Sequence, residues 1–301
     1  MHTPPCMPDP SASRHQLTIE TDDHVVLAAD QAGDGPPVVL LHGLTATRRY
    51  VLMGSRLLER SAFRVIAYDA RAHGRSAPAP DPAAYTYPRL AADLLAVLDA
   101  LAVHRPVLVG ASMGAHTALR FALDHPDRVA ALALVTPAYD PVAPAHGPFG
   151  AEAHRSEDAP SSWDALARGL RERGVEGFLA AYDLAAVPPR WRDTVEKVLR
   201  QRLSEHAHPL ALADALEVVP RSRPFESFDQ LAAIDLPTLV VASRDDADPG
   251  HPLAIAERYA RAIPAARFEV EPLEDPPRSP IAWQGGQLSR LVAELAASRR
   301  T

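Results

Sequence analysis

The chain has 301 residues, of which 47% are hydrophobic and 23% charged, a composition typical of a folded globular protein and not of a disordered one. Its net charge of −7 argues against nucleic acid as the main partner, and its single cysteine, Cys6, excludes an intramolecular disulfide and a cysteine-based metal site. Residues 1–14 lack the apolar run of a secretory signal, and no segment approaches about 18 uninterrupted apolar residues. We therefore expect a cytoplasmic protein without a membrane partner, which begins with a flexible tail over residues 1–14.

The first half of the chain alternates between short apolar segments and segments with helical periodicity. Two alternating stretches on either side of Asp22 and Asp23 predict an antiparallel hairpin. Strands are then predicted over residues 36–43, 63–70, 106–111 and 129–138, with helices over 46–60, 88–103 and 113–124. This alternation indicates βαβ units, and therefore an α/β fold with a mostly parallel sheet whose Val-, Leu- and Ala-rich strands are buried on both faces.

The alternation stops near residue 138. Residues 139–162 are rich in Pro, Gly, His and Ala, and a helical, polar pattern continues to about residue 230. Strands at 236–243 and 266–273 then alternate with helices at 253–263 and 285–299. We therefore predict a core made of residues 15–138 and 231–301, with a helical cap (139–230) inserted over one end of the sheet.

The stretch VLVGASMGAHTAL (107–119) contains Ser112 between two glycines, Gly110 and Gly114, at a predicted strand-to-helix junction. A serine on such a tight turn needs small neighbours, and this pattern with this context is typical of a nucleophilic serine. The turn directs the hydroxyl out of the carboxyl end of the sheet, where the N-terminus of the next helix favours negative charge. Ser112 is therefore the predicted nucleophile.

On this motif the chain resembles the α/β-hydrolase superfamily, over nearly all of residues 15–299. LLHG (40–43) is similar to the family's His-Gly after the third strand. YDARAHGRS (68–76) is similar to the turn after the fourth strand, with Ala72-His73 in place of the usual small-residue pair. The resemblance implies an eight-stranded, mostly parallel sheet flanked by helices, and the backbone N–H groups of Leu44 and Met113 as oxyanion donors.

LPTLVVASRDDADP (236–249) is similar to the family's seventh strand and the turn that carries the catalytic acid. The family spacing makes Asp245 the first choice for the acid and Asp246 the second, whereas Asp248 is too close to His251 along the chain. After the eighth strand the family has a Gly-His pair, and this chain has instead EDPPRSPIAWQGG (274–286). Arg278 and Ser279 stand near that place, and neither does the work of a base at neutral pH.

We assign the role of base to His251, because it follows the predicted seventh strand at the end of the sheet where nucleophile and acid converge. Pro249 and Pro252 stiffen the turn around it, and no histidine follows it in the chain. The competing interpretation is a histidine that only begins the helix 253–263. On that view the base would be sought elsewhere.

Other histidines are alternative bases. His116 lies one helical turn after Ser112, where a packing role explains it better, because the helix directs its side chain away from the serine. The cap offers four more candidates, which are His146, His154, His206 and His208.

The assignments predict a carboxylesterase-like serine hydrolase that cleaves an ester, lactone or related small acyl substrate through an acyl-enzyme, with no cofactor and no metal. The cap aromatics either form an apolar acyl pocket or pack between helices: Trp163, Phe178, Tyr182 and Trp191. An acyltransferase or a carbon–carbon bond hydrolase of the same fold fits the same residues. A binding protein that has lost turnover is the alternative outside enzymes. The missing family histidine favours it, whereas the intact glycine–serine motif and oxyanion loop speak against it.

Overall fold

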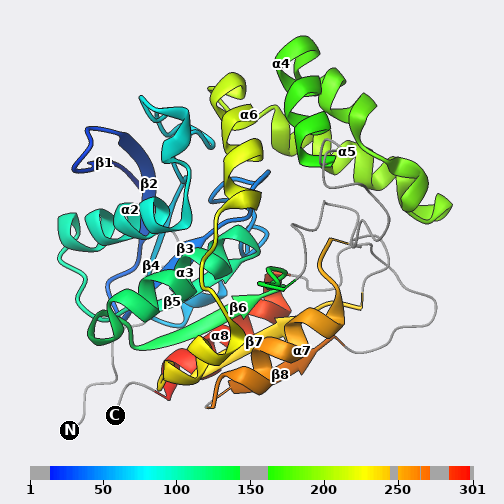
Figure 1. The fold of residues 1–301 in the computed structure, drawn as a ribbon. Coiled ribbons are helices and arrows are strands. Elements are labelled where there is room, and N and C mark those ends of the chain that lie inside the picture. The colour runs from blue at the N-terminus through cyan, green and yellow to red at the C-terminus, as the bar shows by residue number, and fades with distance from the viewer. Residues whose placement is uncertain (1–13, 143–161, 245–249, 265, 272–284, 299–301) are drawn as a thin grey trace, which may run out of the picture.

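The computed structural model describes residues 14–142, 162–244, 250–264, 266–271 and 285–298, and is built around one eight-stranded sheet (Figure 1). The strands are β1 (His15–Glu20), β2 (Val26–Ala32), β3 (Pro37–Leu41), β4 (Arg64–Tyr68), β5 (Val107–Ala111), β6 (Ala131–Val135), β7 (Thr238–Ala242) and β8 (Ala266–Val270). They lie in the order β1-β2-β4-β3-β5-β6-β7-β8. β2 pairs antiparallel with β1 and β4, and every other pair is parallel. The predicted α/β fold with a mostly parallel sheet is confirmed.

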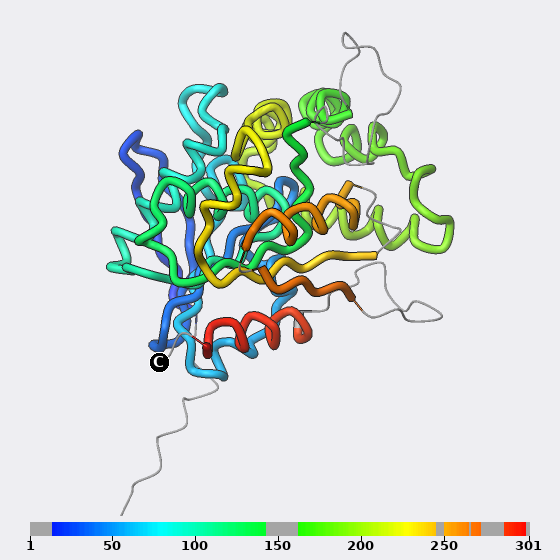
Figure 2. Tube along the Cα trace, turned by 60° about the horizontal axis from the view of Figure 1, so that its bottom comes forward, coloured from blue at the N-terminus to red at the C-terminus, as the bar shows by residue number. Residues whose placement is uncertain are grey.

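Helices cover both faces of this sheet. The core helices are α1 (Leu57–Arg60), α2 (Tyr87–Ala100), α3 (Met113–Asp124), α7 (Leu253–Ala262) and α8 (Gly285–Ala297). α2, α3 and α7 pack on one face, and α1 and α8 pack on the other; Figure 2 shows α8, in red, across the sheet from α7, in orange. Because successive strand side chains point to opposite faces, Val39 joins the first cluster while Val38 and Leu40 join the second. This burial on both faces explains the continuous apolar runs of the strands.

Three further helices, α4 (Ser162–Ala181), α5 (Arg192–Leu203) and α6 (Pro209–Val218), lie between β6 and β7 in the chain and beyond one end of the sheet (Figure 1). We call residues 162–218 the insertion. α4 is bent where Gly174 has φ of 60°. Its Leu166 belongs to one hydrophobic cluster with Leu44 and Met113, from the segments that follow β3 and β5. The insertion therefore lies over the carboxyl ends of the parallel strands.

Short 3₁₀ helices complete the described elements: Pro82–Ala84, Pro126–Arg128, Leu184–Ala186, Pro189–Trp191, Val219–Arg221 and Phe228–Ala233. No described helix is both long and apolar enough to cross a membrane.

The helix predicted over residues 46–60 is wrong for most of its length, since only α1 is helical there. Met53 and Gly54 have φ of 47° and 77°, which lie outside the right-handed helical region. Upstream of them, Arg48 donates to Asp30 at 2.8 Å and also pairs with Asp69. Tertiary contacts to β2 and to the turn after β4 therefore replace a local helix.

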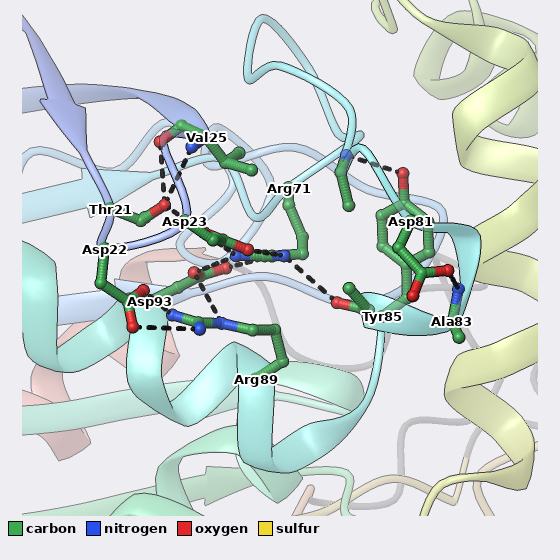
Figure 3. Close-up of polar contacts among 12 residues, drawn as sticks. Thr21, Asp22, Asp23, Val25, Arg71, Asp81, Ala83, Tyr85, Arg89 and Asp93 are labelled. Carbon is green, nitrogen blue, oxygen red and sulfur yellow. Dashed lines mark hydrogen bonds and ion pairs between the residues drawn. The ribbon is translucent and has the colours of Figure 1, made fainter.

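The turn after β4, residues 69–76, is held by a buried ion-pair network (Figure 3). Arg71 is fully buried and donates to both carboxylate oxygens of Asp93 in α2, at 2.6 and 2.7 Å. It also donates to Asp23 of the hairpin turn, at 3.0 and 3.1 Å. A buried charge that loses its partner destabilises a fold strongly, so these bonds fix the position of Arg71. The turn is thereby fixed against both the hairpin and α2.

Candidate active site

Ser112 lies between the last residue of β5 and the first residue of α3, with φ of 50° and ψ of −113°. The two glycines permit a close approach there. A Cβ atom on Gly110 would lie 2.2 Å from the carbonyl oxygen of Gly114, and one on Gly114 would lie 2.2 Å from that of Leu41. Larger residues at both positions would clash with backbone, so this turn depends on glycine.

The imidazole of His251 contacts the hydroxyl of Ser112. The distance between His251 Nε2 and Ser112 Oγ is 2.8 Å, although the residues are 139 positions apart in the chain. His251 directly precedes Pro252, the residue before the first turn of α7. A nitrogen at this distance is in range to accept the hydroxyl proton. The structure therefore brings together the serine and the histidine on which the sequence analysis settled.

Neither the Leu44 N–H nor the Met113 N–H has an acceptor within the described part of the chain. Met113 is the first residue of α3, where an N–H has no partner inside the helix. Leu44 follows Gly43, which lies against the serine: a Cβ atom on Gly43 would be 3.6 Å from the Cβ of Ser112. Met113 is thus bonded to Ser112, and Leu44 to a residue that lies against it.

Several residues weighed for the site, including those rejected, lie outside the described residues: Asp245, Asp246, Asp248, His146, His154, Arg278 and Ser279. Among the described cap aromatics, Phe178 is buried and its ring stacks on that of Tyr182 at 6.3 Å, while Trp163 packs against the same cluster. The Arg190 guanidinium lies over the ring of Trp191, at 5.8 Å. The contacts of these four side chains thus include packing within the insertion.

His116 is buried, and both of its ring nitrogens have partners other than Ser112. Its Nδ1 lies 3.0 Å from the Tyr87 hydroxyl, and its Nε2 accepts the N–H groups of Ala138 and Tyr139, both at 3.1 Å. The ring therefore ties α2 and α3 to the segment after β6. In this structure His251, and not His116, lies next to the nucleophile.

Three further histidines form a buried cluster that the sequence analysis did not foresee. The ring of His73 lies 5.0 Å from that of His42 and 5.6 Å from that of His206, measured between centroids. His206 comes from the insertion, between α5 and α6, whereas the nearby His208 is exposed. Among the described residues, no group of three or more His, Cys, Asp or Glu side chains is arranged to hold a metal ion.

Burial makes the protein sensitive to acid through its histidines. It lowers the pKa of His116 and of His206 to about 3, that of His42 well below its ordinary value, and that of His73 in the same direction. In the unfolded chain a histidine titrates near about 6.5. Below that pH the unfolded state binds protons that the folded state does not bind. His116 and His206 should therefore each reduce the free energy of unfolding by up to about 1.4 kcal/mol per pH unit as the pH falls from about 6.5 toward 3, and His42 and His73 should act in the same direction.

Urea unfolding at pH 7.5, 6.0 and 5.0 would measure this loss. His116→Gln removes one of these titrating groups, so the decrease in unfolding free energy between pH 7.5 and 5.0 should be smaller by about 2 kcal/mol than in the wild type. His104 is exposed, and His104→Gln is the matched control that should reproduce the wild-type decrease. Equal decreases in wild type and His116→Gln would contradict the prediction.

Comparisons with known proteins agree with this architecture. The model of the alpha/beta hydrolase fold family matches residues 36–274. A relative from Variovorax paradoxus, provisionally named carbamate hydrolase RutD, is 33% identical over 215 residues, which cover 71% of this chain and 75% of the relative. A thermophilic esterase from Thermogutta terrifontis superposes with a TM-score of 0.69 at 26% identity, over 96% of this chain and 100% of that one. Est816, an N-acyl homoserine lactone degrading enzyme, has a TM-score of 0.65 at 26% identity, with coverages of 94% and 99%.

Proposed function

The chain belongs to the alpha/beta hydrolase fold family, and on that premise we propose that it is a serine hydrolase that cleaves an ester, a lactone or a related acyl compound such as a carbamate. The observation that carries the proposal is the 2.8 Å contact between Ser112 Oγ and His251 Nε2. The names of its relatives, which describe a carbamate hydrolase, an esterase and a lactone degrading enzyme, support hydrolysis of an acyl bond.

In the proposed mechanism, Ser112 Oγ attacks the acyl carbon while its proton passes to Nε2 of His251. The carbonyl oxygen becomes an oxyanion that accepts hydrogen bonds from the N–H groups of Leu44 and Met113. The leaving group departs with the proton from His251, and an acyl-enzyme remains. Water then attacks the acyl carbon, with His251 as base, and the acid product leaves as Ser112 regains its proton.

Asp245 is the proposed acid of this mechanism. In the chain it lies between the end of β7 and His251, at the position that the family spacing gives to the acid. A carboxylate there would hold the imidazole in the tautomer whose Nε2 accepts the serine proton, and it would stabilise the imidazolium that forms. No cofactor takes part in these steps.

A fluorophosphonate probe tests the proposal, because only an activated serine reacts with it rapidly. We expect rapid labelling of the wild type, with the modified peptide containing Ser112. Ser204 is exposed at the end of α5, so Ser204→Ala is a matched control that should label as fast as the wild type. A folded wild type that resists the probe and turns over no acyl substrate would instead support a binding protein without turnover.

A further inference from the structure

The segment after β3 presents three successive carbonyl groups, of residues 43–45, and each one faces a different buried imidazole. His42 Nδ1 lies 2.8 Å from the carbonyl oxygen of Gly43. His73 Nε2 lies 2.6 Å from that of Leu44, and His206 Nε2 lies 3.4 Å from that of Thr45. We call these three rings the histidine clamp. Its three side chains come from the residue that follows β3, from the turn after β4 and from the insertion.

Backbone groups fix the proton on two rings of the clamp. The Ala70 N–H donates to Nε2 of His42 at 2.9 Å, and the Gly74 N–H donates to Nδ1 of His206 at 2.9 Å. Because a neutral imidazole has one acceptor and one donor, the other nitrogen of each ring carries the proton. That nitrogen therefore donates toward the carbonyl of Gly43 in the first case and of Thr45 in the second.

Holding these carbonyls determines where the oxyanion donor points. The Leu44 N–H and the Gly43 carbonyl belong to one planar trans peptide, so they point in opposite directions. The Gly43 carbonyl accepts from His42 and also from the Ala46 N–H, at 3.0 Å. The peptide that carries the Leu44 N–H is therefore held through its carbonyl, while the N–H itself has no acceptor among the described residues.

The Thr45 carbonyl accepts from His206, and the Leu44 carbonyl faces Nε2 of His73. Nδ1 of His73 faces the Arg71 carbonyl at 2.8 Å, so the neutral ring donates to one of these two carbonyls at a time.

The insertion is bonded to the same region at several points. The Ala207 N–H donates to the Gly74 carbonyl at 2.8 Å, which pairs with the bond from Gly74 to His206. Glu205, which directly precedes His206 in the chain, accepts hydrogen bonds from the Thr47 hydroxyl at 3.0 Å and from the Tyr50 hydroxyl at 2.9 Å. The junction between α5 and α6 is thus hydrogen-bonded both to the turn after β4 and to the segment after β3.

We propose that His206 is a positioning residue for the oxyanion hole, and that the insertion sets the direction of the Leu44 N–H through it. His206 acts on Thr45 directly, and it acts on Leu44 through Gly74 and the neighbouring ring of His73. The inference rests on the proposed serine hydrolase mechanism. It makes the insertion part of the catalytic machinery, because the insertion would order a transition-state contact and not only cover the substrate.

The test compares His206→Ala with His206→Gln, whose terminal amide retains a donor that reaches Thr45. The assay measures kcat and KM on p-nitrophenyl esters, and the inhibition constant of phenylboronic acid, which bonds to the serine oxygen as a tetrahedral anion. For His206→Ala we expect kcat to fall about tenfold, less than the ~10²–10³ cost of deleting a donor outright. Boronate inhibition should weaken by a similar factor, with KM within about twofold, because the contact strengthens only in the transition state.

His206→Gln should recover most of the lost kcat, and His208→Ala, two residues away and exposed, should match the wild type. Wild-type kcat in folded His206→Ala, or a raised KM with unchanged kcat, would overturn the inference. If His206→Ala does not fold, His206→Asn takes its place. Asparagine keeps an acceptor for the Gly74 N–H, but its side chain is too short to reach the Thr45 carbonyl. Equal kcat in the Asn and Gln variants would also overturn the inference. A folded wild type without turnover or labelling would remove the proposed function and the inference with it, whereas active His206 variants would remove the inference alone.

Discussion

Ser112→Ala should abolish ester turnover, with a loss of about 10⁴–10⁶ in kcat, while the protein remains folded. Alanine lacks the oxygen that forms the acyl-enzyme, and the two donors of the oxyanion hole contribute only residual catalysis without it. Alanine fits the same backbone conformation, and among the described residues the hydrogen bond that the hydroxyl loses is the one with His251. The free energy of unfolding should therefore change by no more than about 1 kcal/mol.

Hydrolysis of p-nitrophenyl acetate and thermal unfolding would be measured side by side for this variant. Ser204→Ala serves again as the matched control, and it should keep wild-type kcat. Turnover by Ser112→Ala within tenfold of the wild type would exclude Ser112 as the nucleophile.

His251→Ala should lose nearly as much kcat as Ser112→Ala, and the double variant should lose little more. A serine hydroxyl is a weak nucleophile without a base, so removing either member disables the same step, and such losses do not add. Asp245→Asn should lose somewhat less, because it disturbs the tautomer and the stabilisation of the imidazolium but leaves the base in place.

His116→Ala is the comparison that makes this measurement decisive. His116 is also close to the nucleophile in the chain, but its nitrogens serve Tyr87 and the segment after β6. We expect it to reduce stability more than turnover. If His251 only precedes α7, its removal would cost at most about 1 kcal/mol of stability and spare turnover. An active His251→Ala beside an inactive, folded His116→Ala would refute the assignment.

The fold was predictable wherever its signals are local. Residues 107–124 combine an apolar strand, a glycine-bounded turn and a helical pattern, and they form β5, the turn at Ser112 and α3 within a residue of the expected limits. The segment 46–60 has an equally helical pattern, but long-range bonds of Arg48 and the left-handed conformation of Met53 and Gly54 replace most of the helix. Gly54 is a local signal against a continuous helix, whereas the bonds of Arg48 leave no mark in the local sequence.

The same division applies to the site. Ser112 is marked by its neighbours, and His251 could be inferred because no later histidine exists in the chain. The sequence predicted from the topology of the fold that their side chains approach each other, and the structure shows the contact. His206 and Thr45 are in contact although they are 161 positions apart in the chain. No spacing or periodicity of the sequence indicates this contact. His206 was one of four equivalent cap histidines from the sequence alone.

The backbone conformation of Ser112 carries a thermodynamic cost. At φ of 50° and ψ of −113° it lies where residues with a side chain are strained, typically by about 1–3 kcal/mol. Glycine would occupy the same conformation without that strain. Position 112 is therefore one at which heat resistance and turnover make opposite demands, and a library of variants screened for melting temperature alone would be enriched in the substitution that removes the nucleophile.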